Sequence, residues 1–525
     1  MSSSMKRHSW ESVLTCCDSF KGTLTACNAG LALERAFRCV EKGGSARAEV
    51  VHCPMSDGGA GLLDSLFFPS HSALSSPYIF TRVDVPTAGT TDSCDSAPAP
   101  LVLGPLGEPL NYSGGEYRPH FACDVANRVV VVEMAVASGL PMIPEAKRNP
   151  LRTTSYGVGQ IIKYAVEYVA REHRRKDGPG ADGGVTVFLG IGGSATNDGG
   201  LGALQALGVE MLVKAKDGGS EPLTTPFTGG DLERLTGARL TPAFRQMFFC
   251  AAGGSRTAPY CKEVRLIGDV ANPLVGPDGA TAIFGPQKCD SAWEKTHRER
   301  VLSRLEHGML NASAAIVQSN LHGGKASEDN MKQRVEALRH TPGGGGAGGM
   351  SGFFRYVVGA KWMTGTDVVA ELLDLPAKLQ RCDCMITGEG SFDEQTIRFN
   401  KTLGRLLQMV VVENMRRQSV GQKLLGDVVV ICGRTAYRDA EQVRRLLHEQ
   451  MREKKEYKDA ALAAAIPRVH LLSLTPHHFP VSEALGNAGV CVEERMRRFL
   501  AGEEERYAGK APAAVPAAAK IRAHL

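Results

Sequence analysis

The sequence contains no long apolar run. No stretch approaches the roughly eighteen consecutive apolar residues that a membrane-spanning helix needs. The first residues, MSSSMKRHSWE, include basic side chains, but no apolar segment of the kind found in secretory signals follows them. We therefore expect neither secretion nor insertion into a membrane.

The chain also has little excess of one charge. Its 61 Lys and Arg residues against 56 Asp and Glu residues give a net charge of +5, and the basic residues are spread out. This balance favours neither nucleic acid nor a membrane surface as a partner, although it is compatible with a small anionic substrate. With 43% apolar residues and 59 glycines in 525 residues, we expect a globular protein of two domains with many tight loops.

Several common motifs are missing. The 14 cysteines show none of the paired C-x-x-C spacings of structural zinc sites, so we expect most of them to be reduced and buried. The chain has no G-x-x-x-x-G-K-[ST] loop, no H-R-D or D-F-G motif, no G-x-S-x-G and no H-E-x-x-H. These absences exclude a Walker-type ATPase, a typical protein kinase, an α/β-hydrolase and a zinc peptidase of that type.

The chain finishes with Ala523-His524-Leu525 after an Ala/Pro-rich tail. A small residue, a basic residue and Leu form the pattern of a peroxisomal address. We expect an import receptor to read this tripeptide and bring the protein to a peroxisome or glycosome; otherwise the protein would be cytoplasmic.

Apolar segments alternate with amphipathic ones along the chain. We predict strands at residues 12–17, 48–53, 127–134, 185–190, 384–387, 427–432 and 469–474, and helices at 25–40, 157–173, 290–319 and 481–500. Strands that alternate with helices are typical of an α/β protein with a parallel sheet, in which ligand loops follow the carboxyl ends of the strands.

The segment VTVFLGIGGSATNDGG, residues 185–200, is an apolar strand that stops at glycines. Glycine loops let main-chain N–H groups approach an anion closely, so phosphate binding is the first hypothesis. A rival is a dinucleotide loop of an NAD-dependent oxidoreductase, because residues 190–195 match G-x-G-x-x-G/A and Glu210 follows at about twenty residues. Asp198 counts against the rival, since a carboxylate there would repel the pyrophosphate. A tight turn without a ligand is the third interpretation.

Three further loops place a carboxylate beside glycines after a predicted strand. Asp18, Ser19 and Lys21 stand in DSFKG, where they suit a phosphate or a metal-bound phosphate. The other loops are SDGG with Asp57 and TGEGSFD with Glu389 and Asp393. Oxygen ligands of this kind suit Mg²⁺, although each loop by itself could be a capped turn.

Two loops remain open between alternatives. In NPLRTTSYG, residues 149–157, Arg152 either grips the carboxylate of an acid substrate or pairs with a neighbouring acidic side chain. The glycine-rich run at residues 342–352 either covers nucleotide phosphates or serves as a linker.

Taken in order, eight segments between about residues 13 and 500 resemble the glycerate kinase family of the bacterial glycerate 2-kinase type. They are DSFKGTLTA, CPMSDGGAG, GPLGEP, VEMAVASGLPMIP, NPLRTTSYGVG, LGIGGSATNDGGLGALQALG, DVANPLVGPDGATAIFGPQK and ITGEGSFDEQT. The chain departs from the family where Phe399-Asn400-Lys401-Thr402 replaces the usual Gly-Lys-Ala-Pro segment.

The resemblance implies an ATP-dependent phosphorylation of D-glycerate with release of ADP. It favours 2-phosphoglycerate over 3-phosphoglycerate as the product and implies ATP and Mg²⁺ as cofactors. A non-catalytic nucleotide- or acid-binding homologue is the alternative. The protein would be a monomer or homodimer of two α/β domains with largely parallel sheets and an active-site cleft between them. We assign residues 1–78 and 290–505 to a Rossmann-like domain, 79–289 to a second domain and 506–525 to a tail.

The resemblance also implies roles for individual residues. Asp198 would accept or orient the glycerate hydroxyl proton, and we group it with Lys21 and Asp57 as catalytic. Arg152, Ser194 and Asn197 would bind glycerate. Nucleotide phosphates would be bound by Asp18, Ser19, Gly192, Gly193 and Lys288, and the metal ion by Glu389, Asp393 and Asp269.

Overall fold

The computed structural model confirms an α/β protein with largely parallel sheets. It describes residues 10–20, 22–41, 48–68, 76–85, 101–110, 118–177, 183–249, 260–323, 327–393, 396–397, 401–437, 439–453, 459–474 and 486–502. The chain divides into two compact units. The terminal unit comprises Met1–Pro54, Ser70–Leu74 and Pro376–Leu525, and the central unit comprises Met55–Pro69 and Ser75–Leu375.

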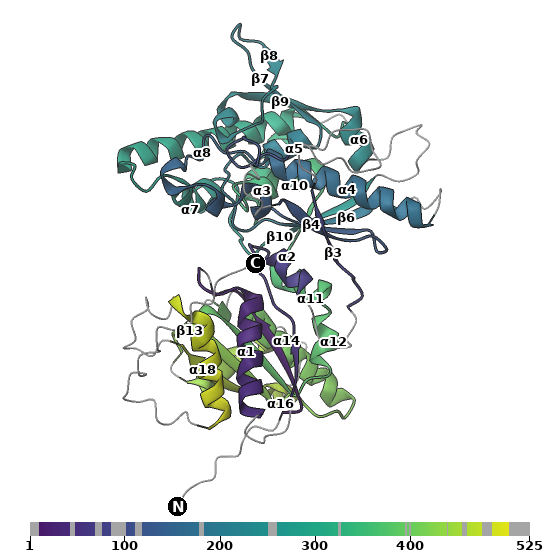
Figure 1. The fold of residues 1–525 in the computed structure, drawn as a ribbon. Coiled ribbons are helices and arrows are strands. Elements are labelled where there is room, and N and C mark those ends of the chain that lie inside the picture. Colours follow the sequence, from purple (N-terminus) through teal and green to yellow (C-terminus); the bar gives the residue numbers. More distant parts are fainter. Residues whose placement is uncertain are drawn as a thin grey trace, which may run out of the picture. The chain divides into compact units, whose positions relative to one another are not determined.

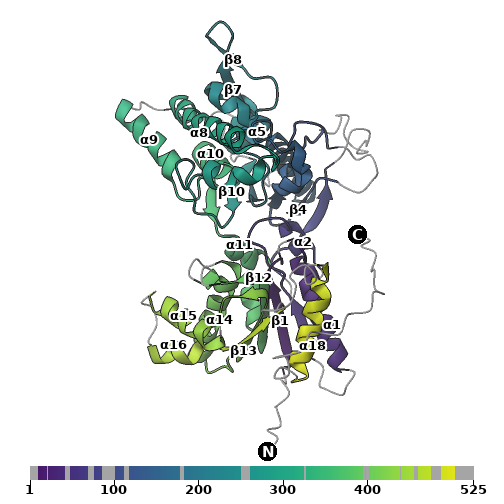
Figure 2. The same ribbon diagram turned by 90° about the vertical axis from the view of Figure 1, so that its left-hand side faces the viewer.

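The terminal unit is built around a parallel sheet of five strands in the order β14-β13-β12-β1-β2. These are β1 (Ser12–Cys17), β2 (Glu49–His52), β12 (Cys384–Phe392), β13 (Asp427–Thr435) and β14 (Arg468–Ser473). Helices α1 (Ala26–Glu41) and α18 (Ala488–Leu500) cover one face, and α14 (Thr402–Ser419), α15 (Ala440–Glu453) and α16 (Asp459–Ala465) cover the other (Figure 2). Because both faces are covered, the strands are nearly continuous apolar runs, as the sequence predicted.

Aromatic and aliphatic side chains fill the terminal unit between β1, α1 and α18. Trp10 stacks on Phe499 with ring centroids 6.3 Å apart and also contacts Phe37. Val13 and Leu33 are completely buried in the same cluster. Among the described cysteines all are free thiols and most are buried, as expected from their spacing.

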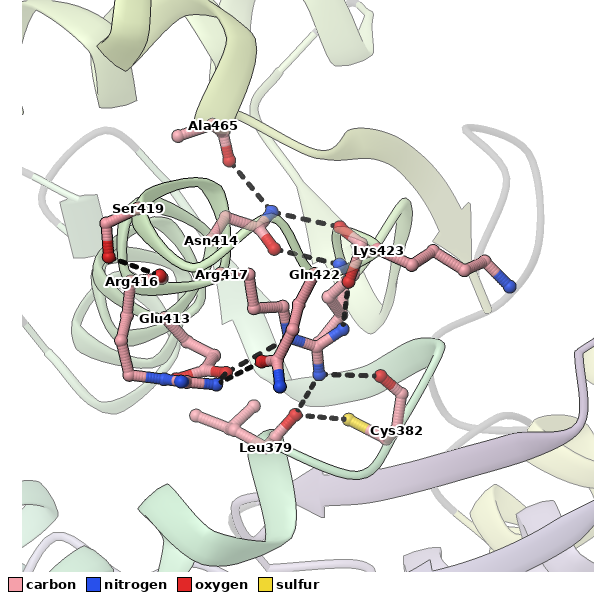
Figure 3. Close-up of polar contacts among 11 residues, drawn as sticks. Leu379, Cys382, Glu413, Asn414, Arg416, Arg417, Ser419, Gln422, Lys423 and Ala465 are labelled. Atoms are coloured by element: carbon pink, nitrogen blue, oxygen red, sulfur yellow. Dashed lines mark hydrogen bonds and ion pairs between the residues drawn. The ribbon is translucent and has the colours of Figure 1, made fainter.

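A buried arginine holds the amino-terminal edge of this sheet together (Figure 3). The guanidinium of Arg417 on α14 donates to the carbonyl oxygens of Leu379, Cys382 and Lys423 and pairs with Glu413. Asn414 bridges the segments before β13 and β14 through the carbonyls of Leu425 and Ala465. Since these groups precede the strands, the opposite, carboxyl edge is left to carry the predicted loops.

The central unit contains a six-stranded sheet in the order β11-β10-β6-β5-β4-β3 (Figure 1). The strands β5 (Val129–Glu133), β6 (Val185–Gly190), β10 (Cys261–Ile267) and β11 (Lys361–Met363) are parallel, whereas β4 (His120–Asp124) and β3 (Thr81–Asp84) are antiparallel. Helix α4 (Tyr156–Asp177) packs on β4, β5 and β6. The four parallel strands therefore end at one edge.

A separate antiparallel sheet, β8-β7-β9, accompanies helix α8 (Lys295–Gln318). It consists of β7 (Val209–Lys214), β8 (Ser220–Pro222) and β9 (Leu235–Leu240). The sequence did not predict this sheet, because β8 is exposed at all three positions and shows no apolar alternation. It did not predict β10 or β11 either.

The observed division differs from the expected boundaries at residues 78 and 290. Helix α8 contacts β9 and the short helix η3 (Gly229–Arg234), and α10 (Met350–Val358) contacts α5 (Leu201–Ala206). These contacts keep the helices between residues 290 and 375 in the central unit, so the last segment of the terminal unit begins at Pro376 rather than at residue 290.

Several predictions concern residues that the structure does not describe. They are Lys21, Phe399, Asn400, the loop 86–100 and the tail 506–525 with Ala523-His524-Leu525. In the described part of the chain, none of the helices has the length and apolar character needed to cross a membrane.

Candidate active site

Two of the predicted glycine loops meet in the central unit. The N–H of Gly192, after β6, donates to the carbonyl oxygen of Gly58 over 3.1 Å. A Cβ atom on Gly192 would lie 2.4 Å from the Cα of Gly59. Such a close backbone contact requires glycine, because any side chain would collide with the opposite loop. The sequence placed both loops after strands, but it could not show that they touch.

The loop after β6 carries two main-chain N–H groups that could bind a ligand, those of Gly193 and Ser194. Leu140 N–H donates to Gly193 O over 2.9 Å, and Ala195 N–H donates to Ser138 O over 2.8 Å, which fixes the loop on both sides. Within the described residues, the N–H groups of Gly193 and Ser194 themselves have no hydrogen-bond acceptor. Gly193 is exposed and Ser194 is half-buried. Successive main-chain donors of this kind suit an anion.

Lys288 lies beneath this loop, at the end of η4 (Pro286–Lys288), and is 2% exposed. Its Nζ contacts Ser194 Oγ at 3.1 Å, Thr196 O at 2.6 Å and Asn197 Oδ1 at 3.0 Å. Burial lowers the pKa of the Lys288 amine to about 7, and the negative charge of Asp198 acts in the opposite direction. The structure thus brings Ser194, Asn197 and Lys288 together, while their roles in binding glycerate and nucleotide phosphates stay predictions.

Asp198 is completely buried and surrounded by donors. Its Oδ2 accepts hydrogen bonds from both the N–H and the hydroxyl of Ser155, each at 2.7 Å, and its Oδ1 accepts from Gly200 N–H at 3.0 Å. Burial raises the pKa of Asp198, whereas these hydrogen bonds lower it. The carboxylate therefore joins the 149–157 segment to the start of α5. A role in accepting the substrate proton stays a prediction.

Arg152 is brought to the same region by this junction. Its neighbour Thr154 accepts a hydrogen bond from Tyr156 N–H at 3.1 Å, and Ser155 is bonded to Asp198. The Arg152 side chain is exposed, and the structure pairs it with no acidic group among the residues that it describes. A role of Arg152 in binding the substrate carboxylate stays a prediction.

Asp57 and Asp269 both adjoin the first residue of α11 (Gly365–Leu372). The Oδ1 of Asp269 accepts a hydrogen bond from Gly365 N–H at 3.0 Å. A Cβ atom on Gly365 would lie 2.2 Å from the carbonyl oxygen of Asp57. The Asp57 side chain closes its own turn by accepting from Gly59 N–H at 2.9 Å. The Asp57 side chain therefore caps its own turn, as one interpretation of the sequence expected. Its main chain lies against the first residue of α11, in the central unit.

Glu133 is a buried carboxyl group beside the loop after β6 to which the sequence assigned no role. It ends β5 beside Gly190 and accepts hydrogen bonds from Gly61 N–H at 2.9 Å and Leu63 N–H at 3.2 Å. Burial raises its pKa to about 7, since these hydrogen bonds compensate only in part. The available signal was an acid at the end of the apolar run VVVVE.

The glycine-rich run at 342–352 is not a linker but part of the packed central unit, and its covering of nucleotide phosphates stays a prediction. Residues 343–352 are buried, and Gly199 N–H donates to Gly348 O over 3.0 Å. Gly348 has a φ of +63°, and a Cβ atom there would lie 2.1 Å from Thr196 O. The run therefore packs directly beneath the loop that carries Ser194 to Asp198.

In the terminal unit, Asp18 follows β1 and Asp393 follows β12, whereas Glu389 lies within β12, which extends beyond the strand predicted at 384–387. Cys17 pairs with Gly388, so Asp18 and Glu389 are close in register. Asp18 accepts from Ser19 N–H at 2.6 Å, and Asp393 accepts from Thr396 N–H at 3.1 Å, which are local caps. The described part of the chain holds no cluster of three or more His, Cys, Asp or Glu residues suited to a metal ion.

The dinucleotide interpretation of the β6 loop is wrong. Glu210 lies on β7, in the antiparallel three-stranded sheet, and pairs with Arg239 at 3.3 Å. In a dinucleotide-binding fold the acid would follow the next parallel strand of the same sheet. The neighbours of β6 are β5 and β10.

The chain is similar to known proteins over most of its length. The profile of the glycerate kinase family matches residues 13–451. Glycerate 2-kinase of Escherichia coli (strain K12) is 30% identical over 74% of this chain and 79% of its own length. Glycerate kinase of Bacillus subtilis (strain 168) is 33% identical over 74% of this chain and 78% of its own length. A crystal structure from Salmonella typhimurium LT2, provisionally named glycerate kinase 2, has a TM-score of 0.57 at 24% identity; the match covers 94% of this chain and 97% of that one, and it shows a shared fold.

Proposed function

The chain belongs to the glycerate kinase family, and on that premise we propose that it transfers the γ-phosphoryl group of ATP to a hydroxyl group of D-glycerate. The observation that carries this proposal is the β6 loop. Hydrogen bonds join the segments that carry four groups suited to anions. These groups are the N–H groups of Gly193 and Ser194, the buried Lys288 and the exposed Arg152. Phosphoryl transfer depends on positioning and charge neutralisation, and this set supplies donors for both.

The anionic substrate offers groups that match these side chains. The planar guanidinium of Arg152 suits the glycerate carboxylate, because it can form two parallel hydrogen bonds. The N–H groups of Gly193 and Ser194 suit a phosphate oxygen. Asp18 and Ser19 of the terminal unit stay candidates for binding nucleotide phosphates.

We further propose that Mg²⁺ accompanies the nucleotide. Asp18, Asp57, Asp269 and Asp393 come shortly after parallel strands, and Glu389 lies in the last part of the parallel strand β12. Mg²⁺ prefers one or two carboxylates together with phosphate oxygens and water, so it does not need a cluster of three protein ligands. Glu389 and Asp393 of the terminal unit, or Asp269 of the central unit, would hold the ion, which would neutralise charge on the transferred phosphoryl group.

One assay tests the function and the product together. The purified chain is incubated with D-glycerate, ATP and Mg²⁺ and followed by phosphorus NMR without proton decoupling. We expect ADP and 2-phosphoglycerate, whose phosphorus couples to the single proton on carbon 2. A signal coupled to two protons would identify 3-phosphoglycerate. Unchanged ATP would contradict the proposed function and favour a non-catalytic homologue.

A further inference from the structure

We propose that Ser194 and Lys288 form a proton relay, in which Ser194 takes the proton of the glycerate hydroxyl and passes its own proton to Lys288. The inference rests on the proposed function and names a route for the proton that phosphoryl transfer releases. It replaces Asp198 as the proton acceptor with groups that the structure places in direct contact.

The contacts of the Lys288 amine leave one position for exchange of a proton with Ser194. Thr196 O and Asn197 Oδ1 can only accept hydrogen bonds, so they take two N–H groups of the amine. The third contact, at 3.1 Å, is to Ser194 Oγ, which can both donate and accept. A neutral amine would receive the Ser194 hydroxyl proton on its lone pair, and an ammonium group would donate back along the same line.

The surroundings make a neutral amine accessible near neutral pH. Lys288 is 2% exposed, and the groups that contact its Nζ are uncharged. Helix α7 (Ala280–Phe284) packs on η4, and its buried Thr281 adds no charge. Asp198 is the charged group whose field acts on the amine, and burial outweighs it, giving a pKa of about 7. A base that titrates near neutral pH is well matched to proton transfer at that pH.

Ser194 is the member of the pair that can reach a substrate. It is half-buried and stands beside the exposed Gly193, whereas Lys288 and Asp198 are buried. The hydrogen bonds of Ala195 N–H and Gly193 O hold Ser194 from both sides. By contrast, the oxygens of Asp198 already accept from Ser155 and Gly200.

The step balances in atoms and charge. The glycerate oxygen forms a bond to the γ-phosphorus of ATP while the bond from that phosphorus to the β–γ bridging oxygen breaks, and ADP leaves. The glycerate hydroxyl proton passes to Ser194 Oγ as the Ser194 proton passes to Lys288 Nζ. Lys288 then releases its proton to solvent through the reverse path before the next turnover.

The test measures kcat and the KM for glycerate between pH 5.5 and 9 for the wild-type chain, Ser194→Ala, Ser194→Thr and Ser351→Ala. The relay predicts that wild-type kcat falls as the pH drops below about 7, because Lys288 becomes protonated. Ser194→Ala should lower kcat by about 10²–10⁴-fold and abolish this acid limb. Ser194→Thr retains a hydroxyl and should retain the limb.

Ser351→Ala is the matched control. Ser351 is buried in the same unit, and its hydroxyl has no partner among the described residues, so its loss should leave kcat and the pH profile unchanged. An acid limb that persists in Ser194→Ala, or a change in KM alone, would overturn the relay while the kinase assignment stands. A wild-type chain that forms no phosphoglycerate would overturn both.

Discussion

At the scale of single residues, Arg152 is the group whose chemistry is easiest to separate from the fold. Its side chain is exposed, and its local segment is held by Thr154 and Ser155 rather than by the guanidinium. Changing the head group should therefore alter recognition of the substrate without disturbing the loop.

Arg152→Lys should raise the KM for glycerate by about tenfold and leave kcat nearly unchanged, because a point charge cannot reproduce the two parallel hydrogen bonds of a guanidinium. Steady-state kinetics at saturating ATP measure both constants. Arg239→Lys, at an exposed arginine on β9, is the control and should not change KM. An unchanged KM in Arg152→Lys would remove Arg152 from the substrate site.

Asp198→Asn separates a chemical role from a structural one. The amide would turn an NH₂ group toward donors that now meet carboxylate oxygens, so we expect a loss of about 1–3 kcal/mol in the free energy of unfolding and a lower kcat. Urea denaturation and kinetics would be measured side by side. A large fall in kcat with full stability would instead support Asp198 as the proton acceptor.

Asp124→Asn provides the comparison for that experiment. Asp124 is also buried in the central unit and accepts from the N–H groups of Ile79 and Asn127, but it ends β4, outside the predicted site. The Asp124→Asn variant should have a lower free energy of unfolding than the wild-type chain and an unchanged kcat. Equal effects of the two substitutions on kcat would mean that Asp198 affects turnover through stability alone.

At the scale of elements, the glycine-rich run supports the loop after β6. Gly348 and Gly359 both have positive φ angles, of +63° and +68°. A Cβ atom on Gly348 would collide with Thr196 O, whereas a Cβ atom on Gly359 would meet nothing within 4 Å. Alanine substitutions at the two glycines therefore distinguish the cost of a positive φ angle from the cost of a steric collision.

Gly348→Ala should destabilise the chain more than Gly359→Ala and should also lower kcat, because it displaces the carbonyl that Lys288 contacts. Gly359→Ala should cost only the roughly 1–2 kcal/mol of a left-handed alanine. Urea denaturation and kinetics measure both effects. Equal stability and kcat for the two variants would show that the run does not support the loop.

At the scale of the whole molecule, a single stretch of chain supplies all strands of the central unit. The strands β3 to β11 lie between residues 81 and 363, inside the segment Met55–Leu375. In the terminal unit, by contrast, β1 pairs with both β2 and β12, which are far apart in the sequence. The terminal unit therefore needs both ends of the chain.

A fragment of residues 55–375 should fold on its own with a cooperative urea transition, because it keeps every strand pairing of both central sheets. A fragment of residues 1–375 should gain no further cooperative structure, since β1 would lack β12. Circular dichroism and urea denaturation compare the two. A non-cooperative transition in the 55–375 fragment would contradict this division of the chain.

The sequence by itself predicted the α/β class, the five strands of the terminal sheet, β5, β6 and the loops that follow them. Apolar runs that end at glycines carry this information locally, because a buried strand and its loop are consecutive in the chain. The order of the family's motifs supplied the expected activity. The same local signals could not reveal the exposed β8 or the buried role of the glycine-rich run.

Only the tertiary structure decided which of these loops meet. The contact of Gly192 with Gly58, the bonds of Ser155 to Asp198 and those of Lys288 to Ser194 join residues that are 43 or more positions apart. Such contacts depend on strand order and on how loops pack, which no short stretch of sequence records. For the same reason Glu210, at the right spacing for a ribose, lies in a different sheet, whereas Glu133, to which its family segment gave no role, pairs with Gly190 at the end of β5.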